Sequence, residues 1–213
     1  SYYSFDGDSN NTVKDGWGQR NGTNAGGEYV DGKSGKGLKV NGTTKATFPT
    51  ADNLTEQWTV GYWMYITETP SGRSSVMMST DTYYSLNNQM HNSAKPGVNV
   101  GSGSGSFLTL NGTIPLNTWV NMTWTNDRTN GLRLYINGTK VAENSWTKTA
   151  TNNFPAPVEV VGGTGFNGIV DEVKIYNRAL TETEVAVSML TNGLNIAETN
   201  VEMHPGETHT IEV

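Results

Sequence analysis

The sequence predicts an all-β protein built as a sandwich of two antiparallel sheets. Short runs of β-branched and aromatic residues recur along its 213 residues, while helical periodicity is almost absent. The chain also has 25 glycines, and Asn-Gly pairs, which favour tight hairpin turns, separate several of the runs. Many short strands with such turn signals are typical of sandwiches, and this length suffices for one domain with a sizeable core.

Local patterns assign the strands. Residues 119–125 alternate, so that Val120, Met122 and Trp124 share one face. The clearest hairpin joins residues 132–136 to 140–142 through Asn137-Gly138. We expect further strands at residues 38–40 and 46–48, joined as a second hairpin, and at 58–66, 76–78, 83–86, 98–100, 107–110, 158–161 and 169–176.

Composition and charge exclude several classes of protein. There is no cysteine, so disulfides, thiolate metal sites and cysteine nucleophiles are absent. The formal net charge of −6 does not favour a nucleic-acid partner. No apolar run reaches the roughly 18 residues that a spanning helix requires, so we expect no membrane insertion.

Several segments together resemble a known family. Residues 165–181 combine a β-rich run with a short helical stretch, residues 29–38 form a Gly-Lys-x-Gly hairpin, and residues 134–138 read Leu-Tyr-Ile-Asn-Gly. In this order and spacing they resemble the laminin-G-like, concanavalin A-like jelly-roll modules of secreted bacterial proteins. The resemblance implies a jelly roll with one short C-terminal helix, a secreted or cell-surface location, and glycan binding.

The resemblance covers residues 1–190, which we assign to the jelly-roll module. Residues 191–213 are interpreted as a linker and the start of a possible immunoglobulin-like neighbour, because residues 201–208 resemble the first strand and turn of such a repeat. Alternatively, this segment is a tail that lies along the sandwich. The first interpretation implies a larger polypeptide with further domains.

No arrangement of residues predicts catalysis. The chain has three histidines, of which His91 alone lies within the module, and no Gly-x-Ser-x-Gly motif accompanies it. Glycosidases of related folds use paired carboxylates on one face of a strand. Here Asp171 and Glu172 are adjacent, so a regular strand would point them to opposite faces.

A structural calcium ion is a hypothesis for the first and last strands. Asp6 and Asp8 lie near the opening strand and Asp171 lies in the closing one, and these strands are commonly neighbours in jelly rolls. Calcium takes six to eight oxygen ligands, which carboxylates and loop carbonyls supply. The alternative is that Asp171 is buried and bonded to backbone amides, with Asp6 and Asp8 as turn residues.

Sugar binding requires exposed aromatic rings beside polar side chains. Trp63, Trp119, Tyr135 and Tyr176 lie in predicted strands, where we expect them to be core residues. Other aromatics lie in polar or glycine-rich surroundings. The predicted ligand-binding residues are Trp17, Gln19 and Arg20 in one loop, Tyr83, Tyr84, Asn88 and His91 in a second group, and Trp146. Alternatively, Trp17 folds over the edge of the sandwich as a lid.

The sequence therefore predicts a non-catalytic carbohydrate-binding module of a larger extracellular bacterial enzyme or adhesin. Its expected partner is a polysaccharide or host glycan, and a monomer is the default state. Two alternatives stay open: a structural or protein-binding adhesin domain, and a glycoside-active enzyme domain with an unrecognised carboxylate pair.

Overall fold

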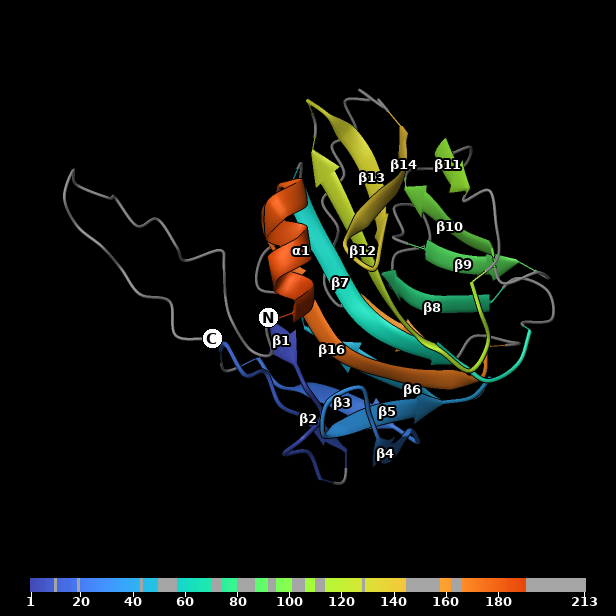
Figure 1. Cartoon of the computed structure of the whole chain (residues 1–213). Helices are drawn as coiled ribbons and strands as arrows, with labels where there is room; N and C mark the ends of the chain where they lie inside the picture. The colour runs from blue at the N-terminus through green and yellow to red at the C-terminus, as the bar shows by residue number, and fades with distance from the viewer. Residues whose placement is uncertain are drawn as a thin grey trace.

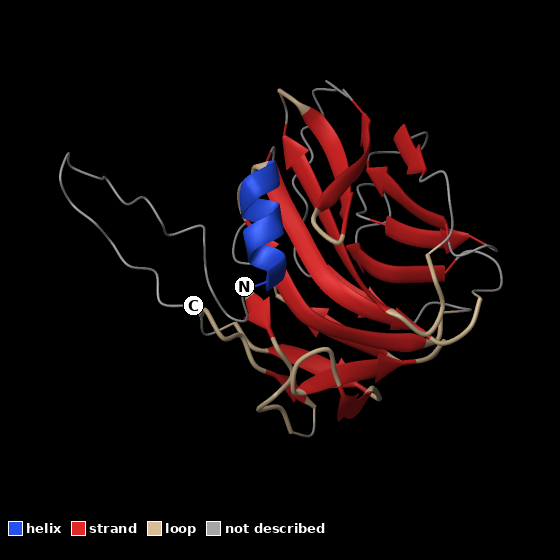
Figure 2. Ribbon diagram, viewed as in Figure 1, coloured by secondary structure: helices blue, strands red, loops and turns tan. Residues whose placement is uncertain are grey.

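The computed structural model describes residues 1–9, 11–18, 20–42, 44–49, 57–69, 74–79, 87–91, 95–100, 106–109, 114–127, 129–144, 158–161 and 166–190. These residues form two antiparallel eight-stranded sheets and one helix, α1 (Glu182–Leu190), which lies beside the strands (Figures 1 and 2). This architecture confirms the predicted two-sheet jelly roll with a short C-terminal helix. No helix in the described ranges is long and apolar enough to cross a bilayer.

The first sheet, sheet A, contains the first and the last of the described strands. Its order is β14-β13-β12-β7-β16-β5-β4, and β1 pairs with β16. The strands are β1 (Tyr2–Tyr3), β4 (Glu28–Asp31), β5 (Lys36–Val40), β7 (Gln57–Ile66), β12 (Trp119–Asp127), β13 (Gly131–Ile136), β14 (Thr139–Asn144) and β16 (Gly168–Tyr176). The first and last strands are therefore neighbours, as expected.

The second sheet, sheet B, has the order β11-β10-β9-β8-β15-β6-β3-β2. Its strands are β2 (Thr12–Val13), β3 (Gly22–Ala25), β6 (Lys45–Phe48), β8 (Ser74–Ser79), β9 (Asn87–His91), β10 (Lys95–Val100), β11 (Ser106–Thr109) and β15 (Val158–Val161). In β8 to β11 and β15 the structure describes the backbone, and Val76 is the one side chain that it describes there.

The main core lies between the two sheets and follows the alternation of the strands. In β12, Val120, Met122 and Trp124 are buried and belong to it, as the sequence predicts. In β7 the inward positions are likewise apolar: Trp58, Val60, Tyr62, Met64 and Ile66. The intervening residues of both strands consequently point to the outer face of sheet A, the face that points away from sheet B.

The hairpin between β13 and β14 is confirmed. Ile136 pairs with Thr139, which leaves Asn137 and Gly138 as the two loop residues. Their φ angles are +48° and +77°, in the left-handed region that a two-residue turn of this type requires. The Asn-Gly dipeptide therefore determines this turn.

The hairpin predicted for residues 38–40 and 46–48 is wrong. β5 pairs within sheet A, whereas β6 pairs with β3 and β15 in sheet B. The local turn does form, because the Thr44 amide donates to the Asn41 carbonyl at 2.9 Å. Apolar side chains of both strands enter the same core from opposite sheets, so this turn is a corner of the sandwich.

Helix α1 begins with a capping box. The Thr181 amide donates to Glu184 Oε2 at 2.8 Å, and the Glu184 amide donates to Thr181 Oγ1 at 3.3 Å. The Arg178 guanidinium binds both oxygens of Glu184, at 2.9 and 2.7 Å. These bonds satisfy donors at the helix N-terminus and fix α1 to the end of β16.

Candidate functional site

The outer face of sheet A is the described surface that combines aromatic and polar side chains. The register of β12, β7 and β16 places these side chains in rows that cross the sheet. Trp119 and Ile169 flank Tyr65 in one row, and Asn121 and Asp171 flank Trp63 in the next. The two following rows are Thr123, Gly61 and Lys174, then Thr125, Thr59 and Tyr176.

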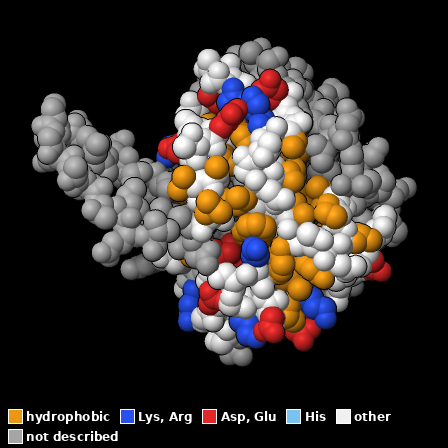
Figure 3. Space-filling view, viewed as in Figure 1, with side chains coloured by type: hydrophobic (Ala, Val, Ile, Leu, Met, Phe, Trp, Pro, Cys, Tyr) orange, Lys and Arg blue, Asp and Glu red, His pale blue; other side chains and the backbone are white. Residues whose placement is uncertain are grey.

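Three half-buried aromatic side chains occupy the first two rows: Trp63, Tyr65 and Trp119. We call them the platform. The rings of Tyr65 and Trp119 are in contact, with centroids 5.5 Å apart and planes inclined by 55°. Figure 3 shows hydrophobic side chains gathered on the middle of this side of the molecule, next to α1. Partly exposed aromatics on a rigid sheet offer apolar contact area that is already ordered.

A cation lies over one of these rings. The Lys33 ammonium is 4.6 Å from the centroid of the Trp63 ring, within the range of a cation–π interaction. Lys33 belongs to the turn between β4 and β5 and is exposed. Lys33 therefore lies over one face of the Trp63 ring.

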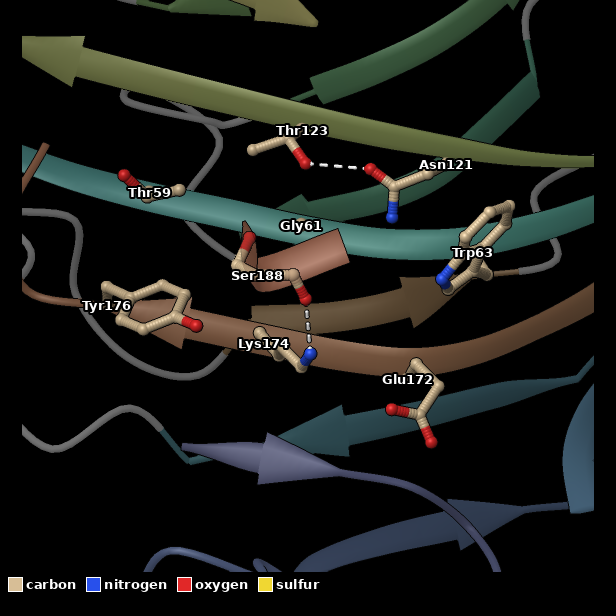
Figure 4. A pocket seen from close by; sticks show the side chains of 9 residues that line it. All are labelled: Thr59, Gly61, Trp63, Asn121, Thr123, Glu172, Lys174, Tyr176 and Ser188. Carbon is tan, nitrogen blue, oxygen red and sulfur yellow. Dashed lines mark hydrogen bonds between the residues drawn. The ribbon is translucent and has the colours of Figure 1, made fainter. Parts of the chain in front are cut away.

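A small hollow adjoins the platform. It is lined by Thr59, Gly61, Trp63, Asn121, Thr123, Glu172, Lys174, Tyr176 and Ser188 (Figure 4). Gly61, at the centre of β7, supplies no side chain, and this creates the space. Ser188 belongs to α1, so the helix forms one wall.

Polar groups of β12 face this hollow. Thr123 Oγ1 donates to Asn121 Oδ1 at 3.0 Å, which fixes the orientation of the amide. The Asn121 nitrogen consequently points over β7 into the hollow, as Figure 4 shows. An amide N–H pair in this position can donate to a hydroxyl or carbonyl oxygen.

Glu172 and Lys174 form the floor of the hollow on β16. A β-bulge occurs between Asp171 and Lys174, and Glu172 has a φ of +54°. The bulge breaks the alternation, because Val170 and Val173 both enter the core with Asp171 and Glu172 between them. Asp171 and Glu172 therefore do not point to opposite faces as a regular strand would require, and Glu172 lines the hollow together with Lys174. Tyr2 Oη donates to both Glu172 oxygens at 2.9 Å.

The charged groups of Glu172 and Lys174 both bond to other elements of the fold. Lys174 Nζ donates to the Ser188 carbonyl of α1 at 2.6 Å. Burial lowers the pKa of Lys174 to about 8, while the Glu172 carboxylate opposes this shift. Burial raises the pKa of Glu172, an effect that the Tyr2 hydrogen bond opposes. Together the two groups connect β1, β16 and α1.

Trp17 is packed against other aromatics. Its ring centroid lies 5.5 Å from that of Tyr2 and 5.2 Å from that of Tyr176. It covers a second, smaller core cluster between α1 and sheet A, which contains Tyr135, Tyr176, Leu180 and Val185. Trp17 is thus a half-buried part of this cluster, and its role in ligand binding stays a prediction.

The other predicted ligand residues are not brought together by the described structure. Arg20 is exposed, and its carbonyl accepts a hydrogen bond from Tyr3 Oη at 3.0 Å. Asn88 and His91 lie in β9, but their side chains are outside the description. Gln19, Tyr83, Tyr84 and Trp146 lie outside the described residues.

The three aspartates proposed as calcium ligands mainly accept bonds from backbone amides. Asp171 Oδ2 accepts from the Lys33 and Ser34 amides at 2.7 and 3.0 Å, and Oδ1 accepts from the Glu172 amide at 2.7 Å. Burial raises the pKa of Asp171 to about 7, although these amides oppose the shift. Asp6 Oδ1 accepts from the Lys36 amide at 2.6 Å. The two carboxylates therefore anchor the β4–β5 turn.

This donor set fits a cation poorly, because amide N–H groups direct positive charge at the oxygens that would bind it. Within the described ranges, no three or more His, Asp or Glu residues form a group that could hold a metal ion. Asp8 Oδ1 accepts from the Lys14 amide at 2.8 Å, whereas its Oδ2 is buried without a hydrogen-bond partner among the described residues. A calcium ion at these residues stays a prediction.

Sequence reasoning missed the platform because it assigned Trp63 and Trp119 to the core. Tyr135 and Tyr176 are indeed buried, with 0% and 3% of their surface exposed, but Trp63 and Trp119 are half-buried on the outer face. The signal was present in the sequence: Trp58, Val60 and Tyr62 point inward, so Trp63 must point outward. The position of an aromatic residue within its strand, and not the apolar residues beside it in the sequence, decides which face of the sheet it occupies.

Solved structures with the same fold include binding domains and enzymes. The binding domain of botulinum neurotoxin serotype G is 14% identical with a TM-score of 0.73, and the match covers 89% of this chain and 50% of that one. The Trypanosoma rangeli sialidase is 19% identical with a TM-score of 0.72, covering 89% of this chain and 32% of that one. This chain thus spans about half of the toxin domain and about a third of the sialidase.

A third structure matches over nearly its whole length. Domain 4 of an extracellular arabinanase from Geobacillus stearothermophilus, solved in complex with arabinotriose, is 22% identical with a TM-score of 0.61, covering 88% of this chain and 96% of that domain. No curated protein matches the chain. The family model of the concanavalin A-like lectin/glucanases superfamily matches residues 40–186, which is more than half of the sequence. The chain therefore belongs to the concanavalin A-like lectin/glucanases superfamily.

Proposed function

We propose that this protein is a non-catalytic carbohydrate-binding module that holds a glycan against the outer face of sheet A. The observation that carries the proposal is the platform of Trp63, Tyr65 and Trp119 beside the Asn121 amide. Sugar rings present apolar C–H faces that stack on aromatic rings, and their hydroxyls need polar groups nearby. The platform and the amide provide both within adjacent rows of one rigid sheet.

The structural neighbours support a binding role. Two of the matches discussed above are a toxin binding domain and an arabinanase domain solved with arabinotriose. By analogy, the ligand is a neutral polysaccharide or a host glycan, and the module works as one domain of a larger extracellular bacterial enzyme or adhesin. Linear arabinan and arabino-oligosaccharides are therefore the first probes to try.

The charged residues of the hollow argue against a catalytic role for this face. Glu172 is held by Tyr2 of β1, and Lys174 by the Ser188 carbonyl of α1, so both groups join elements of the fold. Paired catalytic carboxylates must face a substrate across a cleft. Asp171 and Glu172 instead bond to protein amides and a tyrosine hydroxyl.

The test compares two tryptophan variants of the same chain by isothermal titration with arabinotriose, xylotriose, cellotriose, laminaritriose and maltotriose. We expect Trp63→Ala to weaken binding about ten-fold or more, since truncating a central aromatic contact costs roughly 2 kcal/mol. Trp17→Ala is the matched control, because Trp17 is also half-buried but packs against Tyr2 and Tyr176. We expect it to lower the melting temperature and to retain binding.

The opposite pattern would place the ligand at the Trp17 loop, as the sequence alone suggested. If the wild type binds no probe on a broad glycan array, and its deletion from the parent protein abolishes adhesion to cells, the domain is a protein-binding adhesin. New reducing ends after incubation with labelled polysaccharides would show that it is an enzyme.

A further inference from the structure

Within the described residues the platform is closed beyond Gly61, whereas its other end carries the half-buried Tyr65 and Trp119. Thr59, Thr125 and Tyr176, which form the row beyond Gly61, are buried. The segment that enters α1 covers Thr59, the middle residue of this row: Thr59 Oγ1 donates to the Arg178 carbonyl at 2.9 Å and accepts from the Leu180 amide at 2.9 Å. A ligand that lies along β7 therefore meets a wall immediately beyond Gly61.

Gly61 leaves the space where such a ligand would end. A glycine in the middle of a central strand weakens the sheet, and it often marks a place where a ligand approaches closely. A Cβ atom built on Gly61 would lie 3.0 Å from Thr123 Oγ1 and 3.6 Å from Thr123 Cγ2. A methyl group at this position would therefore force the Thr123 side chain, whose hydroxyl is bonded to Asn121, to shift.

The hollow over Gly61 is polar and small. Its enclosed part has space for a group about the size of a water molecule, which matches a hydroxyl substituent better than a whole sugar ring. The Asn121 amide nitrogen points into it (Figure 4). Tyr176, with 3% of its surface exposed, also lines it, and its buried Oη has no hydrogen-bond partner among the described residues.

A buried hydroxyl without a hydrogen-bond partner lowers the stability of the fold, so a ligand group that bonds to Tyr176 Oη would gain free energy on binding. A ligand hydroxyl in the hollow would accept from Asn121 Nδ2 or exchange a hydrogen bond with Tyr176 Oη. The sugar that carries this hydroxyl would rest against Trp63. From Gly61 to Tyr65 the strand rises roughly 13 Å, which gives a short oligosaccharide room along the platform.

We propose that the module binds the end of a glycan chain: the terminal sugar places a hydroxyl in the hollow over Gly61, α1 blocks continuation of the chain, and the following sugars lie on the platform. This inference rests on the proposed function and adds which part of the polymer is bound. A site for the interior of a chain would be open at both ends.

Stoichiometry tests the inference. Each probe is a linear polysaccharide in size-fractionated form together with its short oligomers: 1,5-arabinan, xylan, laminarin, amylose and soluble cellulose derivatives. Isothermal titration and analytical ultracentrifugation count the modules bound per chain. We expect one module per chain at every length, with the affinity per chain unchanged. Several modules on one long chain would overturn the inference and leave carbohydrate binding intact.

A glycine variant provides the second readout. Gly61→Ala fills the hollow with a methyl group, and we expect it to weaken binding ten-fold or more. Its melting temperature should not exceed that of the wild type, because the added Cβ crowds Thr123 Oγ1 at 3.0 Å. Titration well below the melting temperature, where the variant is folded, separates the loss of the hollow from a loss of stability. Gly7→Ala is the matched control, since its added Cβ meets only Lys14 Nζ, at 3.4 Å, away from the hollow.

The outcomes separate the two claims. If Gly61→Ala binds the probes with the same affinity as the wild type, the chain-end inference is wrong and the proposed function stands. Failure of the wild type to bind every linear probe would overturn the proposed function, and the chain-end inference with it.

Discussion

At the scale of single residues, Asp171 shows how a buried acid can organise a surface loop. Its two oxygens accept three backbone amides, two of them from the turn between β4 and β5. Gly32 lies so close that a Cβ there would be 2.5 Å from Asp171 Oδ2. The turn that presents Lys33 to the Trp63 ring is therefore positioned by one carboxylate from β16.

We predict that Asp171→Asn lowers the free energy of unfolding by about 1–3 kcal/mol. Asparagine keeps one acceptor oxygen, but its NH₂ group faces an amide donor, which leaves a buried donor unpaired. Urea unfolding followed by tryptophan fluorescence measures the change. Asp31→Asn is the control, because Asp31 is exposed and its carboxylate bonds to the exposed Lys36 ammonium at the same turn. Equal effects of the two substitutions would contradict the anchoring role.

Chelation separates this explanation from the calcium hypothesis. Amide donors already occupy the Asp171 oxygens, so we expect EDTA to leave the melting temperature of the wild type unchanged. Calcium binding to the folded state alone would instead raise the melting temperature with calcium concentration, by mass action. A melting temperature that falls in EDTA and recovers with added calcium would support the ion proposed from the sequence.

At the scale of elements, α1 and β16 depend on each other. The capping box of Thr181 and Glu184 begins the helix, and Arg178 holds the Glu184 carboxylate. At the other end, Lys174 Nζ binds the Ser188 carbonyl. The helix thus forms the wall of the hollow because residues of the preceding strand and loop fix both of its ends.

We predict a pH-dependent loss of stability from Glu184. Its hydrogen bonds with Arg178 lower its pKa from 4.5 to about 2 in the folded state. A carboxyl with a depressed folded-state pKa stabilises the fold above its unfolded pKa, and this contribution is lost as the pH falls from 4.5 toward 2. Urea midpoints at pH 7, 4 and 2.5 measure it. Glu184→Gln should be less stable at pH 7 and should lose less on acidification; parallel profiles would contradict the prediction.

Removal of the cap itself should have a smaller effect. Thr181→Ala takes away the acceptor of the Glu184 amide, and loss of such a cap costs about 1 kcal/mol. Thr181→Ser keeps the hydroxyl and should recover most of this stability. Thermal unfolding by circular dichroism compares the two variants, and equal melting temperatures would argue against the cap.

At the scale of the whole molecule, one core joins the two sheets, and a second small cluster fixes α1 to the outer face of sheet A. A domain with one shared core unfolds cooperatively. Residues 191–213 lie outside the described residues, and their assignment as a linker and the start of a neighbour stays a prediction. On that assignment, deletion of residues 191–213 leaves the melting temperature unchanged. A large decrease would show that the segment packs on the sandwich.

The sequence by itself determined the fold class, the β13–β14 turn and the helix after the last strand. Each depends on local chemistry: alternation in β12, positive φ at Asn137 and Gly138, and the capping box at Thr181. It also contained the outward position of Trp63, because alternation along β7 fixes the face of every residue in a regular strand.

Only the tertiary structure decided which strands are neighbours. The turn after Val40 is local, but whether it makes a hairpin or a corner depends on partners far along the chain, such as β15 and β16. The bulge at Glu172 likewise arises where β16 meets β7 and β1. It places the Glu172 carboxylate on the outer face of sheet A, although regular alternation from Asp171 would have pointed it inward. The platform and the hollow over Gly61 exist because three distant strands and α1 meet, and no local pattern specifies that meeting.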